Sequence, residues 1–197
     1  MELEKIAGLP AHPLFVHVPV VLIPLAGILA IIFAVRPAWL DRFGWGLVGL
    51  SGVGMLGAIL AAGSGEALEE MLEDKGEVIS KSLKKHAEMG ETARTVAIVF
   101  FLIVLAVVLV RSMAKKRAEG SGVSKFVASK GGAVAMSVLL ALSAAGATYA
   151  TATAGHSGAE EVWKEEFGNT GGDYYEEEDE DGIILQDAGT TPADAAG

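Results

Sequence analysis

Histidine is the residue type whose chemistry stands out in this sequence. The chain of 197 residues has four, His12, His17, His86 and His156, and it has no cysteine. Neutral imidazole is the commonest protein ligand for metal ions, and two imidazoles from facing helices can hold a haem iron from its two sides. The lack of cysteine excludes disulfides, thiolate zinc sites, iron–sulfur clusters and covalent c-type haem attachment within the chain.

These four side chains leave several kinds of site open. Haem b could take His17 and either His86 or His156 as its axial ligands, with His12 as a second-site or orienting residue. Together with Glu66, the same histidines could bind zinc or copper instead. They could also form a proton-sensing cluster, because unperturbed histidine titrates near pH 6.5. The fourth reading has no cofactor, and the rings then only form hydrogen bonds that anchor the helix ends.

Four apolar stretches must position these histidines. They cover residues 14–35, 44–62, 93–110 and 131–154, and only Arg94, at the start of the third, is charged. Each approaches or exceeds the roughly 20 residues that a helix needs to cross a bilayer. Backbone groups in lipid must be satisfied within the segment, so the spans must be helices. The sequence therefore predicts an all-α, integral membrane four-helix bundle, in agreement with 51% hydrophobic residues and a mean hydropathy of +0.44.

The short loops predict the orientation of the bundle in the cell membrane. Basic residues gather in the 36–43 turn and the 111–130 loop, at Arg36, Arg42, Arg111, Lys115, Lys116, Arg117, Lys125 and Lys130. The positive-inside rule places these loops in the cytoplasm. Both termini and all four histidines then lie on the extracytoplasmic side. His17 lies about 5 Å inside the first span at 1.5 Å per residue, and ionisable groups in spans are functional candidates.

Two segments outside the spans have their own character. In the long 64–94 loop, apolar residues at 67, 68, 71 and 72 recur at helical spacing with acidic residues between them. This pattern predicts a helical loop lying on the extracytoplasmic interface. Acidic residues dominate 164–197, and we expect this tail to be mostly disordered from about residue 168. The membrane domain is therefore residues 1–163.

Small residues in the second span predict close helix packing. Gly54, Ala58 and Ala62 fall four apart, as do Gly57 and Ala61, and the pair Gly49 and Val53 repeats the interval. Such spacing lets helix backbones approach closely in lipid.

Three motifs occur in order along the chain, and each contains at least one histidine. They are His12-Pro13-Leu14-Phe15-Val16-His17, His86-x-x-x-Gly90 and Gly155-His156-Ser157-Gly158. With four spans between them, they resemble the bacterial membrane family catalogued as domain of unknown function 2231, over roughly residues 10–163. This chain departs from the common pattern of that family in its long charged 64–92 loop and in its acidic tail.

The resemblance implies a four-helix membrane fold and assigns the motif positions to His12, His17, His86, His156 and the glycines 90 and 158. Some members of the family look like fusions to Rieske or cytochrome c domains. The resemblance therefore implies electron transfer or a respiratory assembly, with haem as a candidate cofactor. No redox domain is fused to this chain, so an extracytoplasmic redox protein would be a separate partner.

Two function classes follow from these observations. The first is a membrane protein that binds haem b or a metal for electron transfer. The alternative is a non-catalytic accessory or scaffold subunit of a larger membrane complex, with structural histidines. An enzyme is the weakest class, because no phosphate loop occurs and Gly63-Ser64-Gly65 is read as a helix-end turn instead of a nucleophile elbow. The net charge of −10 gives no support to nucleic-acid binding.

Overall fold

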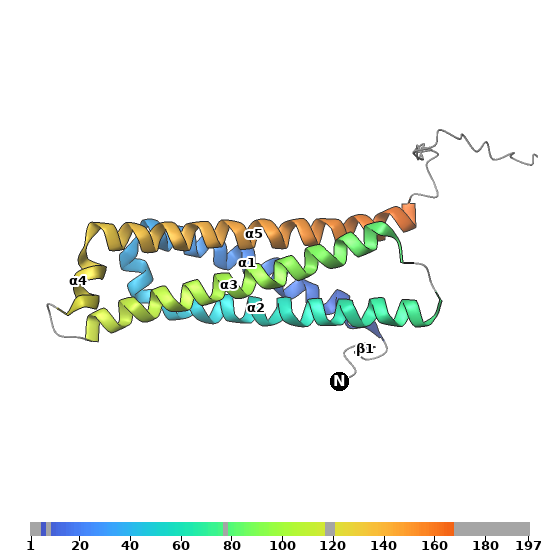
Figure 1. The fold of residues 1–197 in the computed structure, drawn as a ribbon, viewed down its shortest axis with the longest axis horizontal. Helices are drawn as coiled ribbons and strands as arrows, with labels where there is room; N and C mark the ends of the chain where they lie inside the picture. Colours follow the sequence, from blue (N-terminus) through green and yellow to red (C-terminus); the bar gives the residue numbers. More distant parts are fainter. Residues whose placement is uncertain (1–4, 7–8, 77–78, 117–120, 168–197) are drawn as a thin grey trace, which may run out of the picture.

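The computed structural model describes residues 5–6, 9–76, 79–116 and 121–167. Within them, four long helices make up almost the whole fold: α1 (His12–Val35), α2 (Pro37–Asp74), α3 (Lys81–Lys116) and α5 (Lys130–Phe167) (Figure 1). The short helix α4 (Gly122–Ala128) lies at one end of the bundle, and β1 (Lys5–Ile6) pairs antiparallel with β2 (Leu9–Pro10) before α1. The predicted acidic tail lies outside the described residues from residue 168 onward.

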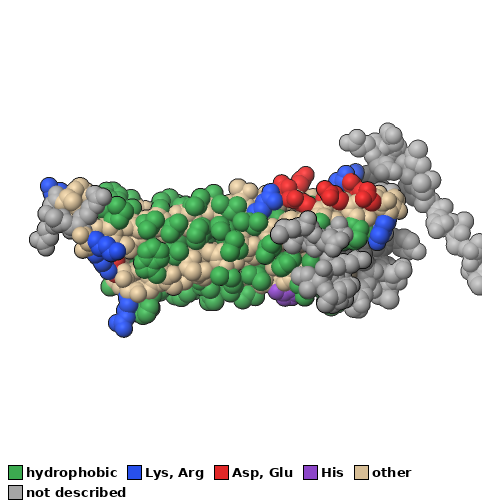
Figure 2. All heavy atoms as spheres, turned by 90° about the horizontal axis from the view of Figure 1, so that it is seen from below, with side chains coloured by type: hydrophobic (Ala, Val, Ile, Leu, Met, Phe, Trp, Pro, Cys, Tyr) green, Lys and Arg blue, Asp and Glu red, His purple; other side chains and the backbone are tan. Residues whose placement is uncertain are grey.

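The long helices form an antiparallel four-helix bundle. Helix α1 packs against α2 and α5, and α3 packs against the same two helices, so α1 and α3 occupy one diagonal and α2 and α5 the other. All four helices are long and apolar enough to cross a membrane. Figure 2 shows apolar side chains across the middle of one face of the bundle, with charged side chains gathered towards its two ends. The predicted four-span, all-α architecture is confirmed.

Three of the helices are longer than a bilayer requires. Helices α2, α3 and α5 have 38, 36 and 38 residues, which is about 54–57 Å at 1.5 Å per residue, against a hydrocarbon core of about 30 Å. Residues 67–72, which were predicted to lie along the extracytoplasmic interface, are helical. They form part of the last turns of α2. No proline interrupts residues 63–74, and their Ala, Leu, Glu and Met favour a continued helix. This segment therefore projects along the bundle axis.

The end of the bundle that carries α4 is basic, and we call it the basic end. Here α1 ends at Val35, and Arg36 (φ −124°, ψ 77°) leaves the helical conformation, which is disfavoured before a proline, so that Pro37 begins α2. Asp41 Oδ1 accepts a hydrogen bond from Arg111 Nε at 2.7 Å, and its Oδ2 lies 3.6 Å from Lys115 Nζ. These ion pairs join α2 to α3.

Small residues allow the helices to touch. Ala26, Ala30, Ala144 and Ala147 are completely excluded from solvent in the core. A Cβ added to Gly57 would lie 2.5 Å from Val18 Cγ1, so α1 and α2 meet there through bare backbone.

The prediction of close packing is confirmed for residues 54, 57, 58 and 61, which are buried. It is wrong for Gly49 and Val53, which are exposed, and a Cβ on Gly49 would meet nothing within 4 Å. Gly49 and Val53 differ from the four buried residues because they lie on a different face of α2.

Candidate functional site

Two of the four histidines meet at the end of the bundle opposite the basic end. His12 is the first residue of α1, and His86 lies in the second turn of α3. Their ring centroids are 6.2 Å apart, and the ring planes make an angle of 80° in an edge-to-face contact. Because α1 and α3 lie on one diagonal, this histidine pair reaches across the bundle axis. We call this end of the molecule the histidine end.

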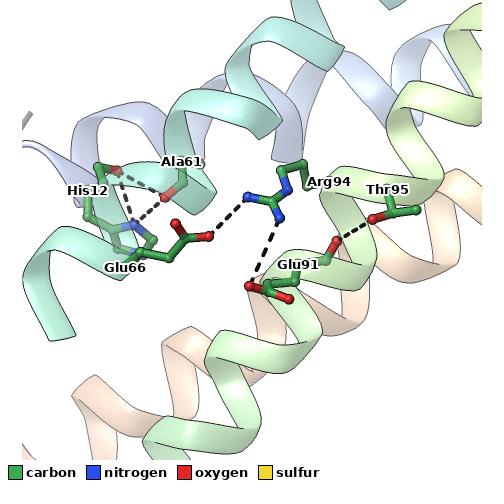
Figure 3. A network of polar contacts seen from close by, with 7 residues as sticks. His12, Ala61, Glu66, Glu91, Arg94 and Thr95 are labelled. Carbon is green, nitrogen blue, oxygen red and sulfur yellow. Dashed lines mark hydrogen bonds and ion pairs between the residues drawn. The ribbon is translucent and has the colours of Figure 1, made fainter. Parts of the chain in front are cut away.

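The ring of His12 is held by α2. Its Nδ1 lies 2.9 Å from the carbonyl oxygen of Ala61 and 3.4 Å from Ser64 Oγ, and Ser64 Oγ itself donates to the Ala61 carbonyl at 2.9 Å (Figure 3). A carbonyl oxygen only accepts hydrogen bonds, so Nδ1 of His12 must carry the proton. The neutral ring then carries its lone pair on Nε2.

The ring of His86 is held by α5 in an equivalent way. Its Nδ1 lies 2.9 Å from Ser157 Oγ, which donates its own hydrogen to the carbonyl oxygen of Ala154 at 2.9 Å. Since the serine hydrogen is engaged by that carbonyl, the serine oxygen accepts from the imidazole. His86 therefore has the same tautomer as His12, with its lone pair on Nε2.

A glycine follows each of these serines and makes room for the ring. A Cβ on Gly65 would lie 3.2 Å from Nδ1 and Cε1 of His12, and a Cβ on Gly158 would lie 2.8 Å from Cε1 of His86. Both rings therefore lie directly on helix backbone. The pattern Ala-x-x-Ser-Gly occurs at 61–65 in α2 and again at 154–158 in α5, so the second diagonal supplies two equivalent supports for the histidine pair.

His17 and His156 lie away from this arrangement. His17 is five residues beyond His12, which places it about 140° around α1 at 100° per residue. Its side chain is exposed, and its Nδ1 donates to the Pro13 carbonyl. His156 is 77% exposed, and its Nε2 lies 3.3 Å from Glu160 Oε1. The ring that contacts His86 is thus that of His12, which the sequence had assigned an orienting role.

Glu66, the predicted carboxylate ligand, forms an ion pair instead. Its Oε1 accepts from Arg94 at 3.0 Å, and the second guanidinium nitrogen of Arg94 lies 4.0 Å from Glu91. Figure 3 shows the Glu66 carboxylate directed towards Arg94, between α2 and α3. Through its ion pair with Arg94, Glu66 links α2 to α3 near the histidine pair.

The spacing of the two rings is that of two imidazoles on one metal ion, provided that both Nε2 atoms face the same point. Two imidazoles that each bind an ion at about 2.0 Å have ring centroids about 5–6 Å apart, close to the observed 6.2 Å. Metal-binding histidines usually donate the other ring N–H to a carbonyl, carboxylate or water, and both rings here donate through Nδ1.

Sequence reasoning missed the two serines. Gly63-Ser64-Gly65 was read as a helix-end turn, yet these residues lie inside α2. The Ala-x-x-Ser-Gly spacing, which begins at the end of the second span and is repeated at the end of the fourth, is the signal that could have revealed them. Ser64 is almost completely buried.

Comparison with known families agrees with the three histidine motifs. The family described as predicted membrane protein (DUF2231) matches residues 8–171. The chain belongs to the DUF2231 family. The match contains all three motifs and all four spans, so the resemblance inferred from the motifs is confirmed. For this DUF2231 protein, no curated protein and no solved structure gives a significant match.

Proposed function

We propose that this DUF2231 protein is a redox metal-binding membrane protein in which the histidine pair binds one copper ion. The observation that supports the proposal is the edge-to-face contact of His12 and His86 at 6.2 Å, with each Nδ1–H engaged by a hydrogen-bond acceptor on a neighbouring helix. This arrangement sets both rings in the tautomer that ligates through Nε2.

Copper suits this ligand set better than zinc does. A structural zinc site takes four protein ligands, whereas the described residues contain no group of three or more His, Cys, Asp or Glu side chains around one point. Imidazole suits copper, and copper(II) has the highest affinity of the divalent first-row ions for a given site. Copper(I) is stable with two ligands. When bound, copper would supply one-electron chemistry for exchange with a separate redox protein.

The decisive experiment is a metal titration of the full chain purified in detergent. We expect one copper(I) per chain, measured by competition with a coloured copper(I) chelator, and no stoichiometric zinc. Elemental analysis of the same preparation gives an independent count. Failure to compete for copper overturns the copper proposal, and a Soret band after addition of haem would favour haem b in its place.

We also propose that the basic end lies in the cytoplasm and the histidine end outside, because the basic loops follow the positive-inside rule. The chain has no cysteine, so single cysteines give a clean test. Lys116→Cys at the basic end and Glu88→Cys at the histidine end are both at exposed positions. In intact cells, a membrane-impermeant maleimide should label only Glu88→Cys. Labelling of Lys116→Cys alone would reverse the orientation.

A further inference from the structure

A groove lies between α3 and α5 beside the histidine pair. Its volume is about 520 Å³, and His86 forms part of its wall. Met89 of α3 and Tyr149 and Ala152 of α5 give it apolar lining, while Lys85 and Glu160 contribute charge. Tyr149 is 73% exposed, so the groove is open along the side of the bundle.

The groove crosses the boundary between the hydrocarbon and the headgroups. Tyr149 and Ala152 belong to the fourth apolar span, which ends near residue 154. His156 and Glu160 lie about 3 and 9 Å beyond that point at 1.5 Å per residue, and the polar layer on each side of a bilayer is about 5–8 Å thick. An occupant of this groove therefore has an apolar part and a polar head, as a membrane lipid does.

The charges on the two walls are opposite. Lys85 projects from α3 and forms no ion pair among the described residues, while Glu160 projects from α5 with His156 beside one of its oxygens. One cation and one anion on facing walls complement a zwitterionic head, with its phosphate near Lys85 and its ammonium near Glu160. A primary ammonium can also donate hydrogen bonds to the carboxylate, whereas a trimethylated one cannot.

We propose that this groove binds the headgroup of phosphatidylethanolamine. The phosphate pairs with Lys85, the primary ammonium pairs with Glu160, and the acyl chains continue past Met89 and Tyr149 into the bilayer. The proposal does not depend on a metal at the histidine pair.

Native mass spectrometry of the full chain in detergent, titrated with single lipids, tests this assignment. The wild type should bind phosphatidylethanolamine about 5-fold or more tightly than phosphatidylglycerol or phosphatidylcholine, a preference of about 1 kcal/mol, as expected for one partly exposed charge pair. Lys85→Gln should weaken the binding of all three lipids. Glu160→Gln should weaken phosphatidylethanolamine most, phosphatidylcholine less and phosphatidylglycerol not at all, and so remove the preference over phosphatidylglycerol.

The matched controls are Lys84→Gln and Glu88→Gln, which change exposed charges on α3 that do not line this groove. Both should bind the three lipids as the wild type does. Equal binding of all lipids by the wild type, or equal losses in Lys84→Gln and Lys85→Gln, overturns the proposal. Displacement of the lipid by millimolar inorganic phosphate also overturns it, because the site would then select phosphate alone.

Discussion

Replacement of His12 or of His86 by alanine is expected to weaken copper(I) binding at least about 100-fold, because each supplies one of the two imidazoles and loss of even a supporting residue typically costs 10–100-fold. His17→Ala and His156→Ala should bind copper as the wild type does, since their rings lie away from the pair. The measurement is competition with a copper(I) chelator on the full chain in detergent.

The supporting serine makes this prediction sharper. Ser157→Ala removes the hydroxyl that accepts from His86 Nδ1 while it leaves both imidazoles in place. It should cost about 10-fold in affinity, less than the loss of either ring. If His17→Ala harms binding as much as His12→Ala does, the histidine pair is not the copper site. Unchanged helix content by circular dichroism shows that each variant is folded.

The second large effect is expected at the contact between α1 and α2. Gly57→Ala places a methyl group 2.5 Å from Val18 Cγ1 and 3.0 Å from Pro19 Cδ, and both of these side chains are stiff. Overpacking of this kind costs about 1–3 kcal/mol of the free energy of unfolding. We expect a correspondingly lower midpoint in denaturant titrations followed by tryptophan fluorescence in detergent.

Gly49→Ala is the matched control, because it makes the same substitution on the same helix where nothing lies within 4 Å. Its unfolding midpoint should not fall, since alanine is the better helix former by about 1 kcal/mol. An equal loss of stability in Gly49→Ala would contradict the explanation by packing between α1 and α2.

The histidines of the candidate site could be found in the sequence. Which two of them contact each other could not. The topology of four spans brings every histidine near one end of the bundle, where His12 contacts His86 and His156 lines the same groove as His86. His17 seemed the stronger ligand than His12 because it lies inside an apolar span. Five residues of helix turn it about 140° away, and only the packing of α1 shows which of the two faces the axis.

The long loop illustrates a different limit. Its helical pattern was visible in residues 67–72, but whether those residues lie along the membrane or continue the span depends on the helix that precedes them. In the structure α2 runs without a break to Asp74. A short amphipathic pattern reports which side of a helix is apolar, and it does not report the direction of the helix axis.

The apolar runs and basic loops of the sequence are enough to predict that this protein is all-α, has four membrane spans and carries its basic loops at one end. Those features depend on local runs of apolar residues, because a chain in lipid must satisfy its backbone hydrogen bonds within each span. The contact of His12 with His86, and the two serine–glycine units that hold these rings, are visible only in the packed bundle. Such contacts depend on how each helix is rotated about its axis, and that rotation follows from close packing at glycines such as Gly57.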